Sequence, residues 1–281
     1  MDISDSPLRD TAPAAHYDHV TRAWRLLLGE DLHYGVYEHG DEDLATATQA
    51  LTDRMADAAD LAPGQRVLDV GCGLGTPARH LASAYGVEVL GISTSAVGVA
   101  DATRLTADAG LGDRVRFEVR DGTANGLPDA GFDRVWVLES SHLMPDRSAL
   151  VAECARVLRP GGRIVLCDLM MRRTIPFLEV RRRRAEFATL RQAFGAARMD
   201  PLEQYAALFS RHGLTVDLAE DLTAATRPTF DHWRANARLH RDRVLESLSE
   251  HDLDSFERSA DILASLWDDG TMGYGIIAGH R

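Results

Sequence analysis

The sequence Val-Leu-Asp-Val-Gly-Cys-Gly-Leu-Gly at residues 67–75 joins an apolar run to three alternating glycines. The run predicts a buried strand over 66–70. Thr76-Pro77 predicts the start of a helix, because proline is favoured in the first helical turn. Glycines between a strand and a helix permit positive φ angles and let the backbone approach a ligand closely. This segment therefore predicts a ligand-binding loop at the carboxyl edge of a sheet.

The spacing of the glycines separates two kinds of nucleotide-binding loop. A dinucleotide fingerprint requires G-x-G-x-x-G, but here the third glycine comes one residue early and Thr76 stands in its place. A Walker A loop requires a lysine, and all 31 basic residues of this chain are arginine. Two interpretations remain: a loop for another nucleotide-like molecule, or a tight strand–helix turn without a ligand.

Strands and helices alternate on the C-terminal side of this loop, which predicts a parallel sheet with helices on both faces. We expect seven strands, at 66–70, 87–92, 114–119, 133–138, 163–168, 214–219 and 272–278. Pro160-Gly161-Gly162 is expected to be a turn that leads into the fifth strand. Helices are expected at 16–29, 43–59, 76–85, 95–110, 147–158, 176–195 and 200–211, and a further helical region at 228–268.

Composition and charge exclude several classes of protein. The chain has 281 residues, 45% of them hydrophobic, which is ordinary for a globular protein. Its net charge of −12 disfavours nucleic acid as a partner, and no apolar run reaches the roughly 18 residues that a membrane span needs. Residues 1–10 lack a signal-peptide segment, and three widely spaced cysteines match neither a disulfide framework nor a zinc site. We therefore expect a cytoplasmic protein without a bound metal or membrane partner.

The segment 67–75 resembles the first motif of class I S-adenosylmethionine-dependent methyltransferases. Bacterial natural-product methyltransferases, namely sugar O-, sarcosine/dimethylglycine-type N- and prenyl diphosphate C-methyltransferases, resemble the chain along nearly its whole length. The motifs that carry the two resemblances, in chain order, are Leu32-His33-Tyr34-Gly35, Gly91-Ile92-Ser93-Thr94-Ser95, Arg120-Asp121-Gly122, Phe132-Asp133-Arg134-Val135-Trp136, Leu138-Glu139-Ser140-Ser141-His142 and Leu158-Arg159-Pro160-Gly161-Gly162.

The resemblance implies an α/β, Rossmann-like fold with a seven-stranded, mostly parallel sheet, helices on both faces and a helical lid. We expect a single methyltransferase domain over 1–281. It would comprise an N-terminal helical cap (1–62), a cofactor-binding core (63–168), and lid helices with the last two strands (169–281). The oligomeric state stays open, a homodimer included.

The resemblance also implies which residues bind S-adenosylmethionine. Gly71, Gly73 and Gly75 would approach the cofactor, and Asp69 would shape their loop. Asp121 would accept a hydrogen bond from the adenine amino group, with Gly122 and Thr123 beside the ring, although Asp-Gly is also a common turn pair. Glu139 and Ser140 would lie beside the methionine part. The acid that many relatives place after the second strand to hold the ribose is absent, so Ser93 or Thr94 is its expected substitute.

The N-terminal cap would contribute further contacts. Tyr34 would fold over the methionine carboxylate, or else be a packed aromatic in a loop. His33 and Tyr17 would face the acceptor, although an aromatic residue on an amphipathic helix is more often a packing residue. These interpretations stay open at the level of sequence.

His142 and Asp168 follow the fourth and fifth strands, where ligands bind in open α/β sheets. Histidine titrates near neutrality and suits a general base. The pair is therefore a candidate catalytic base. The alternative is a hydrogen-bonded loop histidine and an aspartate that caps a turn.

Arginines are concentrated between residues 172 and 191 of this acidic chain. On one continuous helix, Arg181 and Arg184 would share a face and could clamp a diphosphate or carboxylate of the acceptor. The alternative is a solvated helix face whose arginines pair with nearby acids.

The function expected from these features is methyl transfer from S-adenosylmethionine to a small-molecule acceptor, by O- or N-methylation in secondary metabolism such as antibiotic biosynthesis. C-methylation of a prenyl diphosphate is one alternative. A non-catalytic subunit that binds S-adenosylmethionine is the other.

Overall fold

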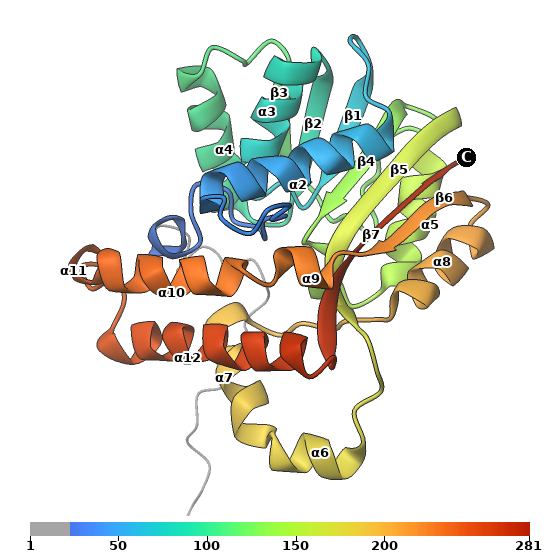
Figure 1. Ribbon diagram of the computed structural model, residues 1–281. Helices are drawn as coiled ribbons and strands as arrows, with labels where there is room; N and C mark the ends of the chain where they lie inside the picture. Colours follow the sequence, from blue (N-terminus) through green and yellow to red (C-terminus); the bar gives the residue numbers. More distant parts are fainter. Residues whose placement is uncertain (1–22) are drawn as a thin grey trace, which may run out of the picture.

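The computed structural model describes residues 23–281, which form one seven-stranded sheet (Figure 1). The strand order is β3-β2-β1-β4-β5-β7-β6, and β7 runs antiparallel to both of its neighbours while the other pairs are parallel. The predicted mostly parallel, seven-stranded α/β fold is therefore confirmed. The strands are β1 (Arg66–Val70), β2 (Glu88–Ser93), β3 (Val115–Val119), β4 (Phe132–Leu138), β5 (Leu158–Met171), β6 (Thr215–Asp221) and β7 (Met272–His280).

Helices cover both faces of the sheet because each buried strand presents apolar side chains alternately to its two sides. Val67 and Trp136 face the core that includes α2 and α3, whereas Leu68 and Val135 face the core that includes α5 and α8. The helices of the core are α2 (Leu44–Ala59), α3 (Thr76–Tyr85), α4 (Ala96–Asp108), α5 (Arg147–Val157) and α8 (Leu202–Arg211), with a 3₁₀ turn η1 (Ser141–Leu143) between β4 and α5.

The remaining helices form a layer beyond the carboxyl edge of the parallel strands, in the lower part of Figure 1. They are α6 (Phe177–Arg182), α7 (Arg184–Phe194), α9 (Thr223–Thr226), α10 (Thr229–Leu239), α11 (Arg241–Val244) and α12 (Glu250–Asp268). α12 packs against both α7 and α10. Among residues 23–281, no helix combines the length and apolar character needed to cross a membrane.

We call this layer of helices the lid. An aromatic cluster joins the lid to the segment that precedes α2. The Tyr34 ring stacks on Trp267 with centroids 5.6 Å apart and packs at 4.9 Å from Trp233. Phe230 and Tyr274 complete the cluster at 5.5 and 5.1 Å from the same ring. Because aromatic pairs stabilise beyond their buried area, the cluster fixes the N-terminal segment over the sheet edge.

Three sequence predictions differ from the structure. Asp168, predicted to end the fifth strand, lies within β5, which continues to Met171. Pro160-Gly161-Gly162 is not a separate turn: β5 runs through it, and the β4–β5 register shifts where Phe132 pairs with Leu158 and Arg134 with Arg163. Gly161 takes a φ of 77°, which lets the extra residues bulge without breaking the strand. The predicted helix 176–195 breaks at Arg183, so α6 and α7 are separate helices.

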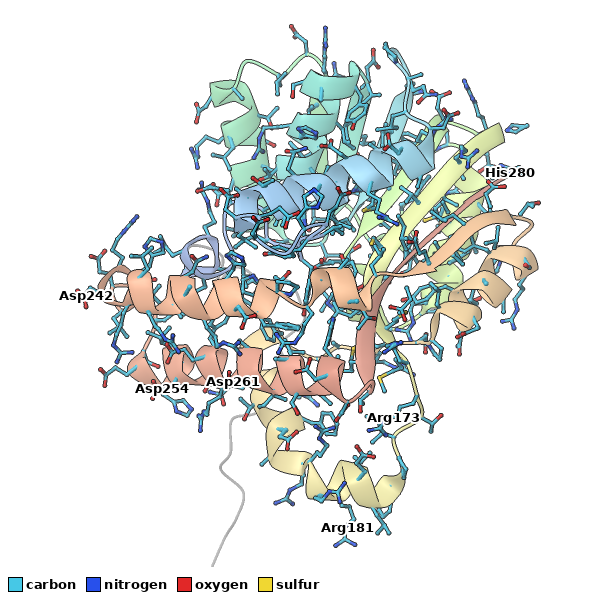
Figure 2. The ribbon with its side chains drawn as sticks, in the orientation of Figure 1. Arg173, Arg181, Asp242, Asp254, Asp261 and His280 are labelled. Atoms are coloured by element: carbon cyan, nitrogen blue, oxygen red, sulfur yellow. The ribbon has the colours of Figure 1, made fainter. Side chains whose placement is uncertain are left out.

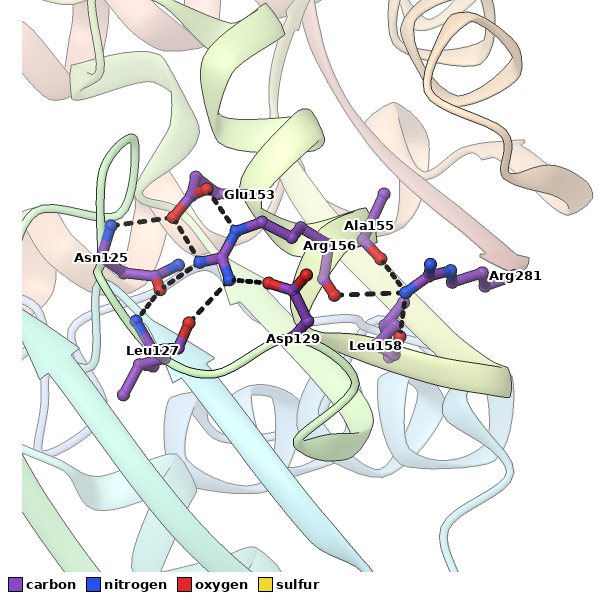
Figure 3. A network of polar contacts seen from close by, with 8 residues as sticks. All are labelled: Asn125, Leu127, Asp129, Glu153, Ala155, Arg156, Leu158 and Arg281. Carbon is purple, nitrogen blue, oxygen red and sulfur yellow. Dashed lines mark hydrogen bonds and ion pairs between the residues drawn. The ribbon is translucent and has the colours of Figure 1, made fainter.

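A polar network holds the loop that follows β3 (Figure 3). The Arg156 guanidinium donates to the carbonyl oxygen of Leu127 at 2.6 Å and to Asn125 Oδ1 at 3.1 Å. Arg281 donates to the carbonyl oxygens of Ala155 and Leu158, where α5 ends. Arginine at a helix C-terminus satisfies carbonyls that lack intrahelical partners. This network therefore keeps the loop, which begins near Asp121, against the core.

The pairing of β6 with β7 depends on a missing side chain at Gly279. A Cβ at this position would overlap the carbonyl oxygen of Thr215, which is backbone and cannot turn away. We expect Gly279→Ala to lower the free energy of unfolding by about 1–3 kcal/mol, as overpacking does. Urea denaturation measures this change. Gly112→Ala, where a Cβ meets no atom within 4 Å, is the matched control and should stay within about 0.5 kcal/mol of the original chain; equal effects would contradict the steric argument.

Candidate functional site

A cavity of about 540 Å³ lies at the carboxyl ends of β1, β2 and β4. Ligands bind at this edge in open α/β sheets because the loops that follow the strands diverge there. The structure brings most of the sequence-predicted residues together in its lining: His33, Asp69, Gly71, Gly73, Ser93, Thr94, Asp121, Gly122, Thr123, Glu139 and Ser140.

The glycine loop has two distinct requirements for glycine. Gly71 and Gly73 adopt φ angles of 87° and 51°, which favour glycine. A Cβ on Gly71 would overlap the side chain of Ser140, so this position serves the contact between β1 and the end of β4. A Cβ on Gly73 would meet no protein atom within 4 Å. Since Gly73 also lines the cavity, its open side is the one that a ligand can approach.

Two carboxyl groups in the lining are deeply buried. Burial raises the pKa of Asp69 to about 7, and no described residue donates a hydrogen bond to its carboxyl group. Burial also raises the pKa of Glu139 to about 8, although hydrogen bonds from the Tyr274 hydroxyl (2.5 Å) and the Tyr34 N–H (2.8 Å) oppose the rise. Glu139 has a φ of 49°, a strain that is typical of functional sites. Both groups are suited to face a cation.

Polar side chains after β2 and β3 form hydrogen bonds within the turns to which they belong. Asp121 Oδ1 accepts hydrogen bonds from the N–H and the hydroxyl of Thr123, at 2.8 and 2.7 Å. The turn and the ligand interpretations of Asp121 are therefore compatible, since one carboxylate has a second oxygen. Ser93 Oγ accepts from the N–H of Ser95 at 3.2 Å, and Thr94 follows it in the lining.

His142 and Asp168 form a buried pair. His142 Nδ1 lies 2.6 Å from Asp168 Oδ1, and the His142 N–H donates to Asp168 Oδ2 at 3.0 Å. The residues are 9% and 2% exposed. Burial opposes protonation of His142, but the Asp168 carboxylate outweighs it and the pKa of His142 is raised. His142 directly precedes Leu143, which lines the cavity, whereas His142 and Asp168 themselves do not line it.

Several predicted residues, His142 and Asp168 among them, are not part of the lining. Gly75 lies behind the loop, where a Cβ would overlap the Phe117 ring, and the Tyr34 side chain lies in the aromatic cluster. Arg181 and Arg184 are exposed on α6 and α7, and Figure 2 shows Arg181 pointing outward at the far end of the lid. The break at Arg183 separates them, so the predicted shared helix face does not exist. Tyr17 lies outside the described residues.

Sequence reasoning missed other residues of the lining. Glu30 and Leu32 enter it from the N-terminal segment, Arg120 from the end of β3, and Leu143 and Met144 from the turn after β4. Arg120 adjoins the Asp121 motif and could have been found there. Glu30 carries no local signal, because only the packing of the N-terminal segment on the lid brings it to the sheet edge.

Comparisons with known proteins identify the family of the chain. Residues 7–271 match the family described as mycolic acid cyclopropane synthetase. The chain is 35% identical over 266 residues to the 27-O-demethylrifamycin SV methyltransferase of Amycolatopsis mediterranei (strain S699), covering 94% of this chain and 95% of that protein.

Two solved structures are similar over nearly the whole chain. The [4+2]-cyclase SpnF has a TM-score of 0.82 and 26% identity, covering 96% of this chain and 97% of its own. The mycolic acid cyclopropane synthase CmaA1, solved with SAH and CTAB, has a TM-score of 0.85 and 21% identity, covering 97% of this chain and 98% of its own.

The fold alone does not specify methyl transfer, since one of these similar structures is named as a cyclase. The family match and the 35% identity to a methyltransferase over 94% of the chain do specify it. The chain belongs to the mycolic acid cyclopropane synthetase family and is an S-adenosylmethionine-dependent methyltransferase.

Proposed function

We propose that this methyltransferase transfers the methyl group to a hydroxyl of a small organic acceptor, with His142 as the general base. The observation that carries the proposal is the buried His142–Asp168 pair, whose histidine directly precedes Leu143 of the cavity lining. A hydroxyl must lose its proton as it is methylated, and a histidine near the cofactor supplies the acceptor for that proton. The name of the full-length relative, which methylates an oxygen, supports the same acceptor atom.

The residues of the cavity fit S-adenosylmethionine. Gly73 leaves space where a side chain would otherwise stand, and Asp69 is a buried carboxyl group without a hydrogen-bond donor among the described residues. We assign Asp69 and Glu139 to the positively charged methionine end and Asp121 to the adenine amino group. Ser93 or Thr94 would contact the ribose in place of an acid. The cofactor, when bound, supplies an electrophilic methyl group on its sulfonium.

The hydrogen bonds of Asp168 select the tautomer of His142. An ionised carboxylate only accepts hydrogen bonds, so the neutral imidazole carries its proton on Nδ1 and donates it to Asp168. Nε2 then keeps its lone pair. No described residue bonds to Nε2, which leaves it able to receive the proton of the acceptor. The remaining work of the chain is to hold the acceptor oxygen in line with the methyl group.

The diphosphate alternative has less support. It requires cations beside the acceptor, but Arg181 and Arg184 do not line the cavity and lie on separate helices. Two solved structures of geranyl diphosphate methyltransferases share only 22% and 19% identity with this chain. Similarity at this level indicates a shared fold and does not indicate a shared acceptor.

Incubation with radiolabelled S-adenosylmethionine tests the proposal directly. The first acceptor to try is 27-O-demethylrifamycin SV, followed by pooled metabolite extracts. Label that enters an alkali-stable ether would support O-methylation, whereas label on nitrogen or carbon would reject it. A chain that binds S-adenosylhomocysteine but labels nothing would favour the non-catalytic alternative.

The role of Gly73 is tested by filling its open side. We expect Gly73→Val to weaken S-adenosylhomocysteine binding at least about tenfold, because the side chain would occupy ligand space. Isothermal calorimetry measures the affinity. Gly110→Val is the matched control, since Gly110 has a similar φ of 70° and no neighbour within 4 Å, but does not line the cavity. Both variants should lose similar stability, and an unchanged affinity in Gly73→Val would reject the assignment.

The pKa values of Asp69 and Glu139 predict pH-dependent cofactor binding. Below pH 7 to 8 both carboxyl groups hold protons in the free protein, and a bound ammonium favours their ionised forms. Binding therefore releases protons, and affinity for S-adenosylhomocysteine should rise from pH 6 to about pH 8, by up to about tenfold per unit for each proton. Calorimetry in buffers of different ionisation enthalpy counts these protons. Glu139→Gln should release fewer, and proton-neutral binding in the original chain would contradict the prediction.

The catalytic pair is tested by removing each partner. We expect His142→Ala and Asp168→Asn each to lower kcat by about 10²–10⁴-fold while the affinity for the cofactor barely changes. The double variant should lose less than the product of the two effects, because the residues act as one unit. Single-turnover methyl transfer measures the chemical step. Full turnover in the double variant would mean that positioning alone supports the reaction.

A further inference from the structure

A hydrogen-bonded chain of side chains extends from the His142–Asp168 pair to helix α8. Asp168 Oδ2 accepts a hydrogen bond from the Ser141 hydroxyl at 2.5 Å, and Ser141 Oγ lies 2.7 Å from the Tyr205 hydroxyl. Ser141 belongs to η1 and Tyr205 to α8. The chain therefore joins three segments: the η1 turn after β4, strand β5 and helix α8.

The direction of each hydrogen bond follows from what the groups can donate. The Asp168 carboxylate donates none, so the single proton of the Ser141 hydroxyl points to Asp168. Ser141 Oγ can then only accept from Tyr205, whose hydroxyl is the donor. Each donor in the series strengthens the next, because hydrogen bonds in a poorly polarisable interior reinforce one another.

Burial makes this arrangement rigid. Tyr205 is 2% exposed, and its ring packs in the apolar core that includes α5 and α8. Asp168 Oδ1 also accepts from the Leu169 N–H at 2.7 Å, so both carboxylate oxygens carry two hydrogen bonds. The segment before α8 adds a further bond, because the Arg198 N–H donates to the carbonyl oxygen of His142 at 2.8 Å. The carboxylate cannot rotate without breaking several of these bonds.

We propose that Tyr205, acting through Ser141, is a positioning residue that orients Asp168 and thereby keeps the proton of the catalytic imidazole on Nδ1. This inference rests on the proposed function of His142 and extends it to a residue of α8 that does not line the cavity. It assigns to α8 a part in the reaction in addition to covering the sheet.

Other charged groups around the imidazole also influence the pKa of His142. Glu139, at the end of β4, favours the protonated form of His142, and Arg147 of α5 disfavours it. Arg147 is itself paired with Asp200, just before α8. Variants that leave these three groups in place therefore report on Ser141 and Tyr205 alone.

The test observes His142 directly and needs no acceptor. Ring ¹⁵N-histidine NMR of the full chain, with S-adenosylhomocysteine bound, reports tautomer and pKa; a His142→Gln spectrum assigns the signal among the 11 histidines. We expect the Nδ1–H tautomer in the original chain. Ser141→Ala should raise the pKa of His142 by about 0.5–1 unit, because a carboxylate that loses a donor holds the imidazolium more strongly. Tyr205→Phe should also raise the pKa of His142, by less than Ser141→Ala does.

Two comparisons separate positioning from a structural role. In an Asp168→Asn background, Tyr205→Phe should change nothing at His142, because the link between them is already broken. Tyr85→Phe removes a tyrosine hydroxyl that bonds the carboxylate of Asp53 far from the site, and should leave the His142 signal unchanged. Melting temperature and S-adenosylhomocysteine affinity monitor the fold of every variant.

The inference is overturned if His142 titrates identically in the original chain, Ser141→Ala and Tyr205→Phe. It is also overturned if Tyr205→Phe lowers only the melting temperature, or shifts His142 equally in the Asp168→Asn background. Failure of the proposed function gives a different result: His142→Ala would then retain turnover, whatever the NMR titration shows.

Discussion

The close contact of Gly71 with Ser140 is the constraint on which the site depends. Ser140 Oγ donates to the carbonyl oxygen of Val70 at 2.6 Å, and no side chain larger than hydrogen fits between the two segments. The contact brings the glycine loop after β1 against the turn after β4. That turn carries Glu139 before Ser140 and His142 after it, so one backbone approach sets the positions of both side chains.

The buried carboxyl groups around this contact differ in how their charge is stabilised. Asp168 accepts four hydrogen bonds and faces His142, which together hold its pKa low despite complete burial. Glu139 has two donors and Asp69 has none among the described residues, so burial dominates and raises their pKa values. An uncompensated buried carboxyl group destabilises the free protein. Under the proposed function, the cofactor cation compensates this cost on binding.

The lid shows how tertiary packing overrides a local pattern. The arginine run suggested one helix with a cationic face, but the chain breaks at Arg183, whose guanidinium pairs with Glu179, Glu186 and Asp269. Arg173 forms a two-pronged ion pair with Glu179 as well. These arginines therefore tie the lid helices to each other and to the end of α12. The aromatic cluster around Tyr34, rather than a cofactor contact of its ring, accounts for that residue's burial.

The sequence by itself predicted the seven strands and the glycine loop, because strand periodicity and glycine spacing act over a few neighbouring residues. The residues at the strand ends followed from the resemblance of short motifs to a known family. The sequence also predicted β1 at its observed bounds and the start of α3 at Thr76. Only the tertiary structure decided that Glu30 joins the lining, that Arg181 and Arg184 stay outside it, and that Tyr205 reaches Asp168 through Ser141. Each of these depends on packing between segments far apart in the chain, and no local pattern specifies how such segments meet.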